Sequence, residues 1–188
     1  ELTRQLVSSL QETSGLYNAR LCLGEGDDLV SAAGQGGYVD GEPPVGYRQP
    51  PGEGIIGHVA QTGEPVLVAD VEQDPRYMAW DGLPDTRSEL AMPLKRGDRV
   101  LGVMDMQSVE PDAFDATELE ALGVLANQLA VAVENARLFE ETQRLQRFNQ
   151  GIVQGMAEGI VVEDAAGRIT FVNPNTVELL GYTFEELE

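Results

Sequence analysis

Apolar residues recur along this chain with two periods, one typical of helices and one typical of strands. Near the start, apolar residues spaced by four predict an amphipathic helix over 2–14. Short apolar runs at 19–23 and 29–33 flank an acidic, glycine-containing turn, which predicts a hairpin. Residues 34–51 are rich in Gly and Pro and show no sustained period, so we expect an irregular surface loop there.

The middle of the chain shows a helix and three strands around a loop that bears aromatic residues. It reads GEGIIGHVAQTGEPVLVADVEQDPRY, then a loop with Trp80, then SELAMPLKRGDRVLGVMDMQS. The first part predicts a short helix over 58–62 and a strand over 66–69. The second part predicts strands over 89–94 and 100–107, joined by a polar hairpin turn.

This order of elements resembles the GAF family of small-molecule-sensing domains, and the resemblance covers roughly residues 1–150. It implies an α+β fold with a central antiparallel sheet. Helices from both ends of the domain would cover one face of the sheet, and a ligand cavity would lie on the other. Such domains occur with PAS domains in bacterial sensor proteins, including histidine kinases.

A long helix is predicted after this core. From Glu118 to Gln150 the chain has no Pro and only one Gly. At about 1.5 Å of rise per residue, this stretch would span about 50 Å, which exceeds the width of a small domain. We therefore expect the helix to extend beyond the domain in which it begins.

Two apolar seams run along this helix. One steps by three and four residues and ends at Ala136, as expected for packing on the domain's own sheet. The other lies about 200° away around the helix and favours a partner helix, in a parallel homodimer formed through the N- and C-terminal helices. The alternative is a helix that packs only on its own domain. The second seam repeats every seven residues and consists of Val124, Val131, Leu138, Leu145 and Ile152.

The last part of the chain looks like the opening of a PAS domain. A hairpin is predicted over 159–172, and Asn173-Pro174 begins a helix that ends at Gly181. Thr183 with Glu186 resembles a capping box for a further helix. The domains expected are thus a GAF-type domain (1–136), a helical coiled-coil linker (137–152) and the N-terminal part of a PAS-type domain (153–188).

Composition limits the classes of partner. The formal net charge of −20, from 32 acids and 12 bases, argues against binding to nucleic acid or to anionic lipid. A single cysteine, Cys22, excludes an internal disulfide and points to a reducing compartment, for which the cytoplasm is the default. No run approaches the ~18 apolar residues of a membrane span, so we expect no membrane contact by this segment.

The resemblance supports no cofactor. Cyclic-nucleotide binders carry an Asn-Lys pair where this chain has Ser108 and Val109, and bilin binders use a Cys next to a His, unlike Cys22. Haem-binding relatives take a His from the loop before the SELAMPL-like strand, whereas the only imidazole here is His58. Relatives that reduce methionine sulfoxide use several cysteines, so we expect no such chemistry. The acids near Asp70 are expected to cap turns, and no metal site is predicted.

The loop before residue 89 is the expected ligand site. Tyr77, Met78 and Trp80 offer flat or adaptable apolar surface, and Arg87 and Ser88 offer hydrogen-bond donors. They could bind a small, partly aromatic or carboxylated ligand. The alternative is that the aromatic residues simply fill the core under the loop and leave no cavity.

Our functional hypothesis from the sequence is a non-catalytic input module of a signalling protein. It would bind a small ligand or relay a conformational signal through a dimeric helix. A ligand-free dimerisation module is the second hypothesis, and a small redox enzyme of the GAF fold is a distant third. No motif for an output enzyme occurs in these residues.

Overall fold

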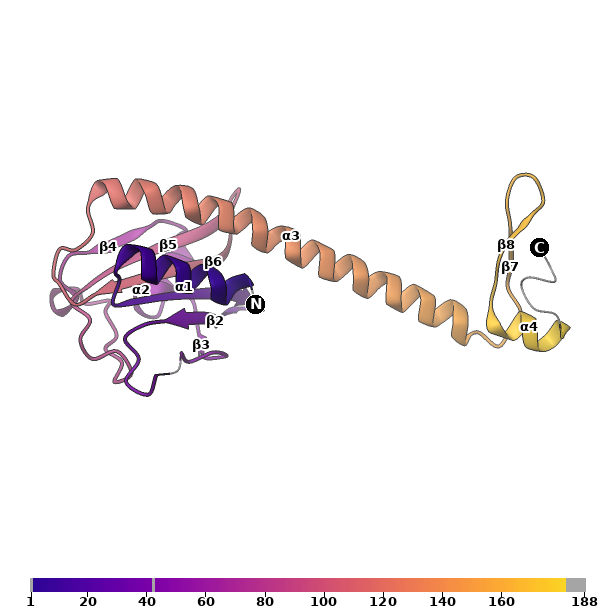
Figure 1. Cartoon of the computed structure of the whole chain (residues 1–188), viewed down its shortest axis with the longest axis horizontal. Helices are drawn as coiled ribbons and strands as arrows, with labels where there is room; N and C mark the ends of the chain where they lie inside the picture. Colours follow the sequence, from indigo (N-terminus) through magenta and orange to yellow (C-terminus); the bar gives the residue numbers. More distant parts are fainter. Residues whose placement is uncertain (1, 42, 182–188) are drawn as a thin grey trace. The chain divides into compact units, whose positions relative to one another are not determined.

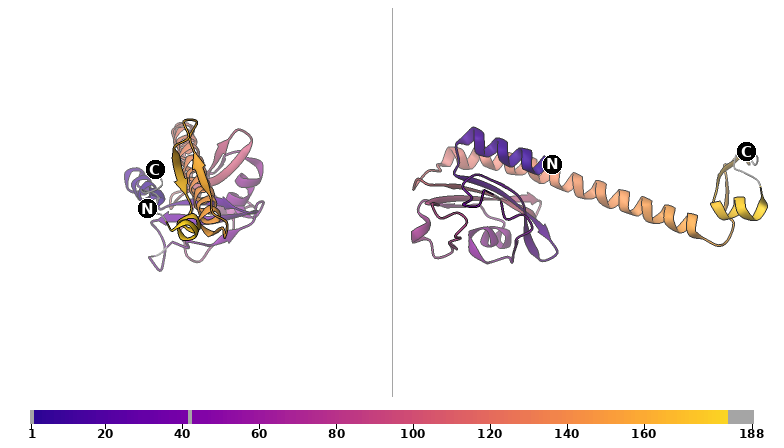
Figure 2. Two further views of the ribbon diagram at one scale, coloured as in Figure 1. Left: turned by 90° about the vertical axis from the view of Figure 1, so that its right-hand side faces the viewer. Right: turned by 60° about the horizontal axis from the view of Figure 1, so that its bottom comes forward.

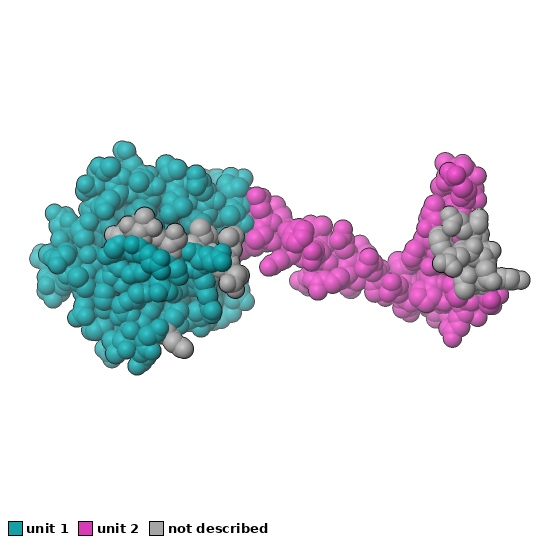
Figure 3. Space-filling view, in the orientation of Figure 1, with its two compact units in different colours: residues 1–134 teal, residues 135–188 magenta. Residues whose placement is uncertain are grey.

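The computed structural model describes residues 2–41 and 43–181, which form two compact units, 1–134 and 135–188 (Figure 1, Figure 3). The first unit contains a six-stranded sheet with helices on both faces (Figure 1). The second contains the end of the long helix, a two-stranded hairpin and a short helix.

All neighbouring strands of the six-stranded sheet are antiparallel, in the order β3-β2-β1-β6-β5-β4. The long central strands β1, β5 and β6 are the apolar runs predicted from the sequence. The α+β class with an antiparallel central sheet is confirmed. The strands are β1 (Asn18–Glu25), β2 (Asp28–Gln35), β3 (Arg48–Gln49), β4 (Val66–Val68), β5 (Ser88–Arg96) and β6 (Arg99–Ser108).

The sheet separates two apolar cores because successive side chains of a strand point to opposite faces. Helices α1 (Leu2–Ser14) and α3 (Ala116–Gly155) cover one face, as Figure 2 shows, and residues of the first half of α3 join this core. Helix α2 (Gly54–Thr62) covers the other face, where Ile55 and Val59 pack with apolar residues of β1, β4 and β6.

Helix α2 is longer than predicted, since it begins at Gly54 and not at His58. The sequence suggested only a glycine-rich turn before His58. Gly52 and Gly54 have φ of +86° and +67°, so the turn that leads into the helix uses the left-handed region, which glycine enters without strain. Gly63 ends the helix in the same region, and its N–H donates to Val59 O.

Helix α3 begins at a reciprocal cap. Asp115 Oδ1 accepts from the backbone N–H groups of Thr117 and Glu118, and Glu118 Oε2 accepts from the N–H of Asp115. By length and composition alone, α3 could also cross a membrane. Its first half instead packs on the sheet, where Ala126 and Leu129 are buried in the core beside α1.

In the second unit, Asn173 organises the loop between the end of α3 and the hairpin β7 (Val161–Glu163) and β8 (Ile169–Val172). Its amide donates to Val153 O and Glu158 O, and its Oδ1 accepts from the N–H of Ile160. It also caps α4 (Pro174–Leu180), which ends at Gly181 as predicted. The further helix expected near Thr183 and Glu186 lies outside the described residues.

Candidate functional site

Four polar side chains lie on the α2 face of the sheet, on the three long strands β1, β5 and β6. Arg20 of β1 is directly opposite Asp105 of β6, and Glu89 of β5 is directly opposite Gln107 of β6. Since Asp105 and Gln107 are two residues apart, their side chains share one face. The strand register therefore brings one guanidinium, two carboxyl groups and one amide together, which we call the polar floor.

The polar floor is held by direct hydrogen bonds. Arg20 Nη2 donates to Asp105 Oδ2 over 3.2 Å, and Gln107 Nε2 donates to the same oxygen over 3.0 Å. Thr86 Oγ1 in turn donates to Gln107 Oε1 over 2.7 Å. The side chain of Asp105 is fully buried and that of Arg20 is 11% exposed, so this ion pair is shielded from water.

Glu89 is the second carboxyl group of the floor, and it is buried. Burial and the neighbouring Asp105 raise the pKa of Glu89 well above its usual range, while Arg20 opposes this increase. The single guanidinium is already hydrogen-bonded to Asp105. If both carboxyl groups were ionised, two negative charges would therefore face a single positive charge in the floor.

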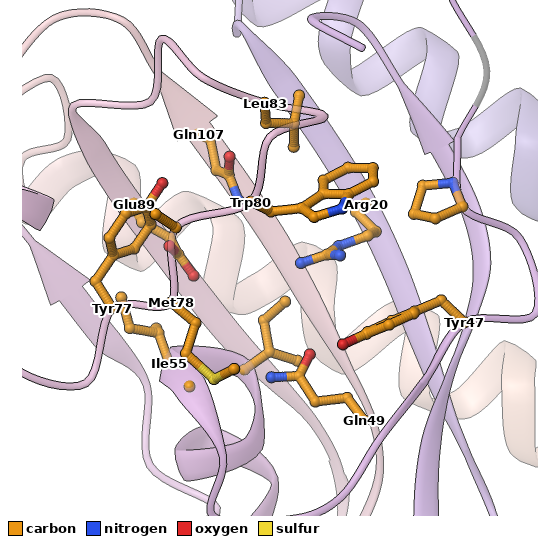
Figure 4. A pocket seen from close by; sticks show the side chains of 14 residues that line it. Arg20, Tyr47, Gln49, Ile55, Tyr77, Met78, Trp80, Leu83, Glu89 and Gln107 are labelled. Carbon is orange, nitrogen blue, oxygen red and sulfur yellow. The ribbon is translucent and has the colours of Figure 1, made fainter. Parts of the chain in front are cut away.

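A pocket lies above this floor (Figure 4). It offers about 120 Å³ to the centres of water-sized molecules, roughly ten times the space that one water needs. A ligand of about ten non-hydrogen atoms would be of suitable size. The lining combines Arg20, Glu89 and Gln107 of the floor with Pro44, Tyr47, Gln49, Gly54, Ile55, Ile56, Tyr77, Met78, Ala79, Trp80 and Leu83.

Trp80 forms part of the roof. Its indole lies beside Arg20 in Figure 4, and its ring meets that of Tyr38 edge to face with centroids 5.9 Å apart. Gly82 is required for this placement, because a Cβ there would overlap the Trp80 ring. The N–H of Leu83 donates to Trp80 O over 2.9 Å, which closes the turn.

Two buried atoms of the polar floor, Arg20 Nε and Asp105 Oδ1, lack a hydrogen-bond partner in the described part of the protein. Arg20 Nε is buried and makes no hydrogen bond with any described residue. A buried donor without a partner costs free energy, and a water or a ligand usually satisfies it. Arg20 thus has bonding capacity left after its ion pair with Asp105.

The structure places the predicted site residues in two groups. Tyr77, Met78 and Trp80 line the pocket, whereas Arg87 and Ser88 do not. Arg87 Nη2 lies 3.6 Å from Asp70 Oδ1 at the surface. Ser88 Oγ donates to the backbone oxygen of Glu110 over 2.7 Å, because Ser88 points to the face opposite its neighbour Glu89.

None of the four residues of the polar floor was predicted from the sequence. The signal was a charged or amide side chain at alternate positions of apolar strands, such as Asp105 and Gln107 in GVMDMQS. Such residues are buried only when they have partners. The partners became visible only with the strand register.

Cys22 lies on the same face of β1 as Arg20, two residues further along the strand. It is buried among apolar residues that include Ile55, and it is not part of the pocket lining. Burial raises the pKa of its thiol to about 11. Among the described residues, no group of three or more His, Cys, Asp and Glu side chains is arranged to hold a metal ion.

Comparison with known proteins identifies the first unit. The family described as "GAF domain" matches residues 1–134, and a shorter match to the PAS fold covers residues 147–188. The chain belongs to the GAF domain family. The GAF domain of a phosphoenolpyruvate-protein phosphotransferase from Coxiella burnetii is similar, with a TM-score of 0.66 and 26% identity over 74% of this chain and 84% of that one.

Several similar proteins are enzymes. Free methionine-R-sulfoxide reductase from Neisseria meningitidis, solved with its substrate, has a TM-score of 0.64 and 31% identity over 72% of this chain and 78% of that one. The yeast (Saccharomyces cerevisiae) reductase of the same name is 37% identical over 40% of this chain and 41% of its own length. This chain spans less than half the length of the curated relatives named here.

These relatives overturn two expectations. A non-catalytic input module was the leading hypothesis, and no enzymatic activity was expected. The yeast and Neisseria proteins are enzymes of the GAF fold, so they fit the redox enzyme that was the third hypothesis from the sequence. The expectation of no enzymatic activity relied on the absence of a catalytic motif and on the single cysteine, and not on the shape and charge of the pocket.

Proposed function

We propose that the pocket binds a small free amino acid of the methionine sulfoxide class. The observation that carries this proposal is the charge balance of the polar floor, where Arg20 faces the two carboxyl groups of Asp105 and Glu89. A ligand with an ammonium group would supply the missing positive charge. It would thereby favour the ionised form of Glu89.

The rest of the pocket suits the other parts of such a ligand. Arg20 Nε is an unused donor for a carboxylate or a sulfoxide oxygen. Trp80, Met78 and Ile55 supply apolar walls for a short thioether-like chain. The pocket volume fits a molecule of about ten non-hydrogen atoms, which is the size of free methionine sulfoxide.

Reduction of the sulfoxide at this site would depend on Cys22, the only cysteine of the chain. Its sulfur would attack the sulfoxide sulfur, release methionine and become a sulfenic acid. A small external thiol would convert the sulfenic acid to a mixed disulfide and water, and a second thiol would free Cys22. This route requires Cys22 to reach the ligand past the apolar residues that now bury it.

The test measures binding and turnover in the same preparations. Calorimetry should detect free methionine-R-sulfoxide, whereas the N-acetylated compound, which lacks the ammonium group, should bind at least about tenfold more weakly. Glu89→Gln should weaken the free amino acid, and the surface variant Glu72→Gln should not. Equal binding of the free and acetylated compounds, or none of either, would refute the proposed ligand class.

Turnover is followed with dithiothreitol as the external thiol, and Cys22→Ser is the matched variant. Methionine release by the wild type and none by Cys22→Ser supports reduction through Cys22. Binding without methionine release by the wild type would refute the reduction step and leave the ligand class intact.

We further propose that this domain works within a signalling protein. Two regulators support this setting: the nitrogen fixation protein VnfA from Azotobacter vinelandii is 30% identical over 50% of this chain, and the Nif-specific regulatory protein from Herbaspirillum seropedicae is 31% identical over 79% of it. A cytoplasmic location and a histidine-kinase output remain predictions. Autophosphorylation of the full-length protein tests the kinase output.

A further inference from the structure

The ligand pocket has a buried end and an open end. Leu83, Glu89 and Gln107 line the buried end and are shielded from water. Tyr47 and Met78 line the same pocket but are 52% and 54% exposed. In Figure 4, Tyr47 lies on the side of the pocket away from Glu89. A ligand whose ammonium group reaches Glu89 would therefore extend towards the open end.

Apolar side chains continue around the open end, beyond the pocket itself. Val39 and Val45 are 65% and 51% exposed, and neither lines the pocket. Val45 follows Pro44, which does line it, and the N–H of Val39 donates to the backbone oxygen of Gly82 over 3.1 Å. Exposed apolar residues gathered at the mouth of a pocket are typical of a binding surface. The group that we call the apolar rim consists of Val39, Val45, Tyr47, Met78 and Trp80.

The charge of the polar floor suits an amino group that has no carboxylate beside it. In the proposed ligand-bound state, the carboxylates of Asp105 and Glu89 face the single guanidinium of Arg20, which leaves one net negative charge. A free amino acid is a zwitterion, so its carboxylate would restore that excess. Arg20 is the only Arg or Lys among the described residues that line the pocket, and it already bonds to Asp105. In the first residue of a peptide an amide replaces the carboxylate, so the ammonium group alone balances the floor.

Exposed carboxylates adjoin the apolar rim. Asp40 and Asp81 each follow a residue of the rim directly, and Glu53 directly precedes the first residue of α2. Arg48 also follows a residue of the rim, but its guanidinium pairs with Glu25 over 3.0 Å. The surface around the mouth is therefore acidic and favours a basic residue in a bound chain.

We propose that this site accepts the amino-terminal residue of a peptide, with methionine sulfoxide as that residue and a basic residue close behind it. The amino group binds at the polar floor, the first side chain lies against the apolar walls of the pocket, and the chain leaves over the apolar rim. This inference rests on the proposed function, because both place the ammonium group beside Glu89. It extends the ligand class from a free amino acid to the start of a longer chain.

The main experiment compares three probes by calorimetry with the full chain. They are free methionine-R-sulfoxide, the tripeptide amide of methionine-R-sulfoxide, alanine and lysine, and the same tripeptide amide with an acetylated amino group. The tripeptide amide should bind on the order of tenfold more tightly than the free amino acid, because it lacks the first carboxylate and covers the apolar rim. Acetylation should weaken the tripeptide amide by at least about tenfold, because it removes the ammonium group.

Two variants with the same change in charge test where the chain leaves the pocket. Asp81→Asn removes a carboxylate beside the rim and should weaken the tripeptide amide about twofold to fivefold at low salt. Asp98→Asn is the matched control, because Asp98 is exposed in the turn at the end of β5 far from Glu89. It should leave the affinity nearly unchanged.

A third variant tests the apolar part of the rim. Val45→Ser should lower the ratio of tripeptide affinity to free amino acid affinity about threefold or more, because only the longer ligand covers Val45. Near-UV circular dichroism of each variant should match that of the wild type, which shows that the domain stays folded.

The outcomes separate this inference from the proposed function. Binding of free methionine-R-sulfoxide with no tighter binding of the tripeptide amide would overturn the inference and leave the proposed function intact. No binding of either would refute the proposed ligand class and the inference with it. An acetylated tripeptide that binds as tightly as the one with a free amino group, or equal effects of Asp81→Asn and Asp98→Asn, would overturn the inference as well.

Discussion

Replacement of Arg20 by Met should destabilise the GAF domain by removing the only positive charge of the polar floor. Methionine keeps most of the apolar stem of arginine, so the change isolates the guanidinium. Asp105 would keep its hydrogen bond from Gln107 but lose its ion pair. Glu89 and Asp105 would then face each other without a counter-charge.

The size of the loss follows from the burial of the pair. Asp105 is fully buried and lies 3.2 Å from a guanidinium that is 11% exposed. Removal of one partner from a buried ion pair costs about 3–5 kcal/mol, since the remaining charge stays in the interior. A domain of this size has roughly 5–15 kcal/mol of stability in total, so the variant should still fold.

The loss should depend on pH. In the variant, a buried carboxyl group without a counter-charge has a raised pKa, and the folded state takes up a proton that the unfolded state has lost. The destabilisation should therefore be full at pH 8 and clearly smaller at pH 5. Urea unfolding of the wild type and of the Arg20→Met variant at both pH values measures this difference.

A double-mutant cycle supplies the control. Asp105→Asn removes the second charge and keeps a side chain that can bond to Gln107. Arg20→Met with Asp105→Asn should therefore recover much of the stability that Arg20→Met loses. A loss below about 1 kcal/mol at pH 8, or a loss that is the same at both pH values, would refute the description of a buried, charge-deficient floor.

Three further outcomes are expected. The free energy of unfolding of the wild-type domain should fall as pH rises from about 4 through the raised pKa of Glu89, and Glu89→Gln should remove this fall. For each unit by which folding raises the pKa of Glu89, the variant should avoid a loss of about 1.4 kcal/mol at pH 8. The same dependence of stability on pH in both proteins, measured by urea unfolding from pH 4 to 8, would contradict this prediction. Gly82→Ala should push Trp80 off the pocket and move its fluorescence to longer wavelength, whereas Gly151→Ala, which meets open space, should not; identical spectra would show that the ring does not rest on Gly82. Cys22 should react with iodoacetamide at pH 8 about a hundredfold or more slowly than in urea, because a pKa of about 11 in place of 9.0 lowers the thiolate fraction by that factor; comparable rates would mean that the thiol is exposed.

The elements of the fold could be predicted from local patterns because each carries its own signal. The strands around Arg96-Gly97-Asp98-Arg99 and the capped start of α3 follow from residues within a few positions of each other. The start of α2 was placed too late, because helix propensity gives no indication that a glycine-rich turn leads directly into a helix.

The candidate site was harder to predict because its partners are far apart in the sequence. Arg20 and Asp105 meet only because β1 pairs with β6 in one particular register. Proximity along the chain instead suggested Arg87 and Ser88, which follow the aromatic loop. Because side chains alternate along a strand, Ser88 points away from the pocket and Glu89 points towards it. Which of the two faces the pocket is known only when the strand register is known.

Mutations on the two faces of β6 should have different consequences. Met104 and Met106 belong to the core beside α1 and α3, whereas Asp105 and Gln107 belong to the polar floor. Substitutions along this strand would therefore alternate in effect: changes at Met104 or Met106 would disturb the apolar packing behind the sheet, whereas changes at Asp105 or Gln107 would disturb the charge balance of the floor. The charge on the floor side would thus contribute to both stability and ligand preference, while the packing on the other side contributes to stability alone.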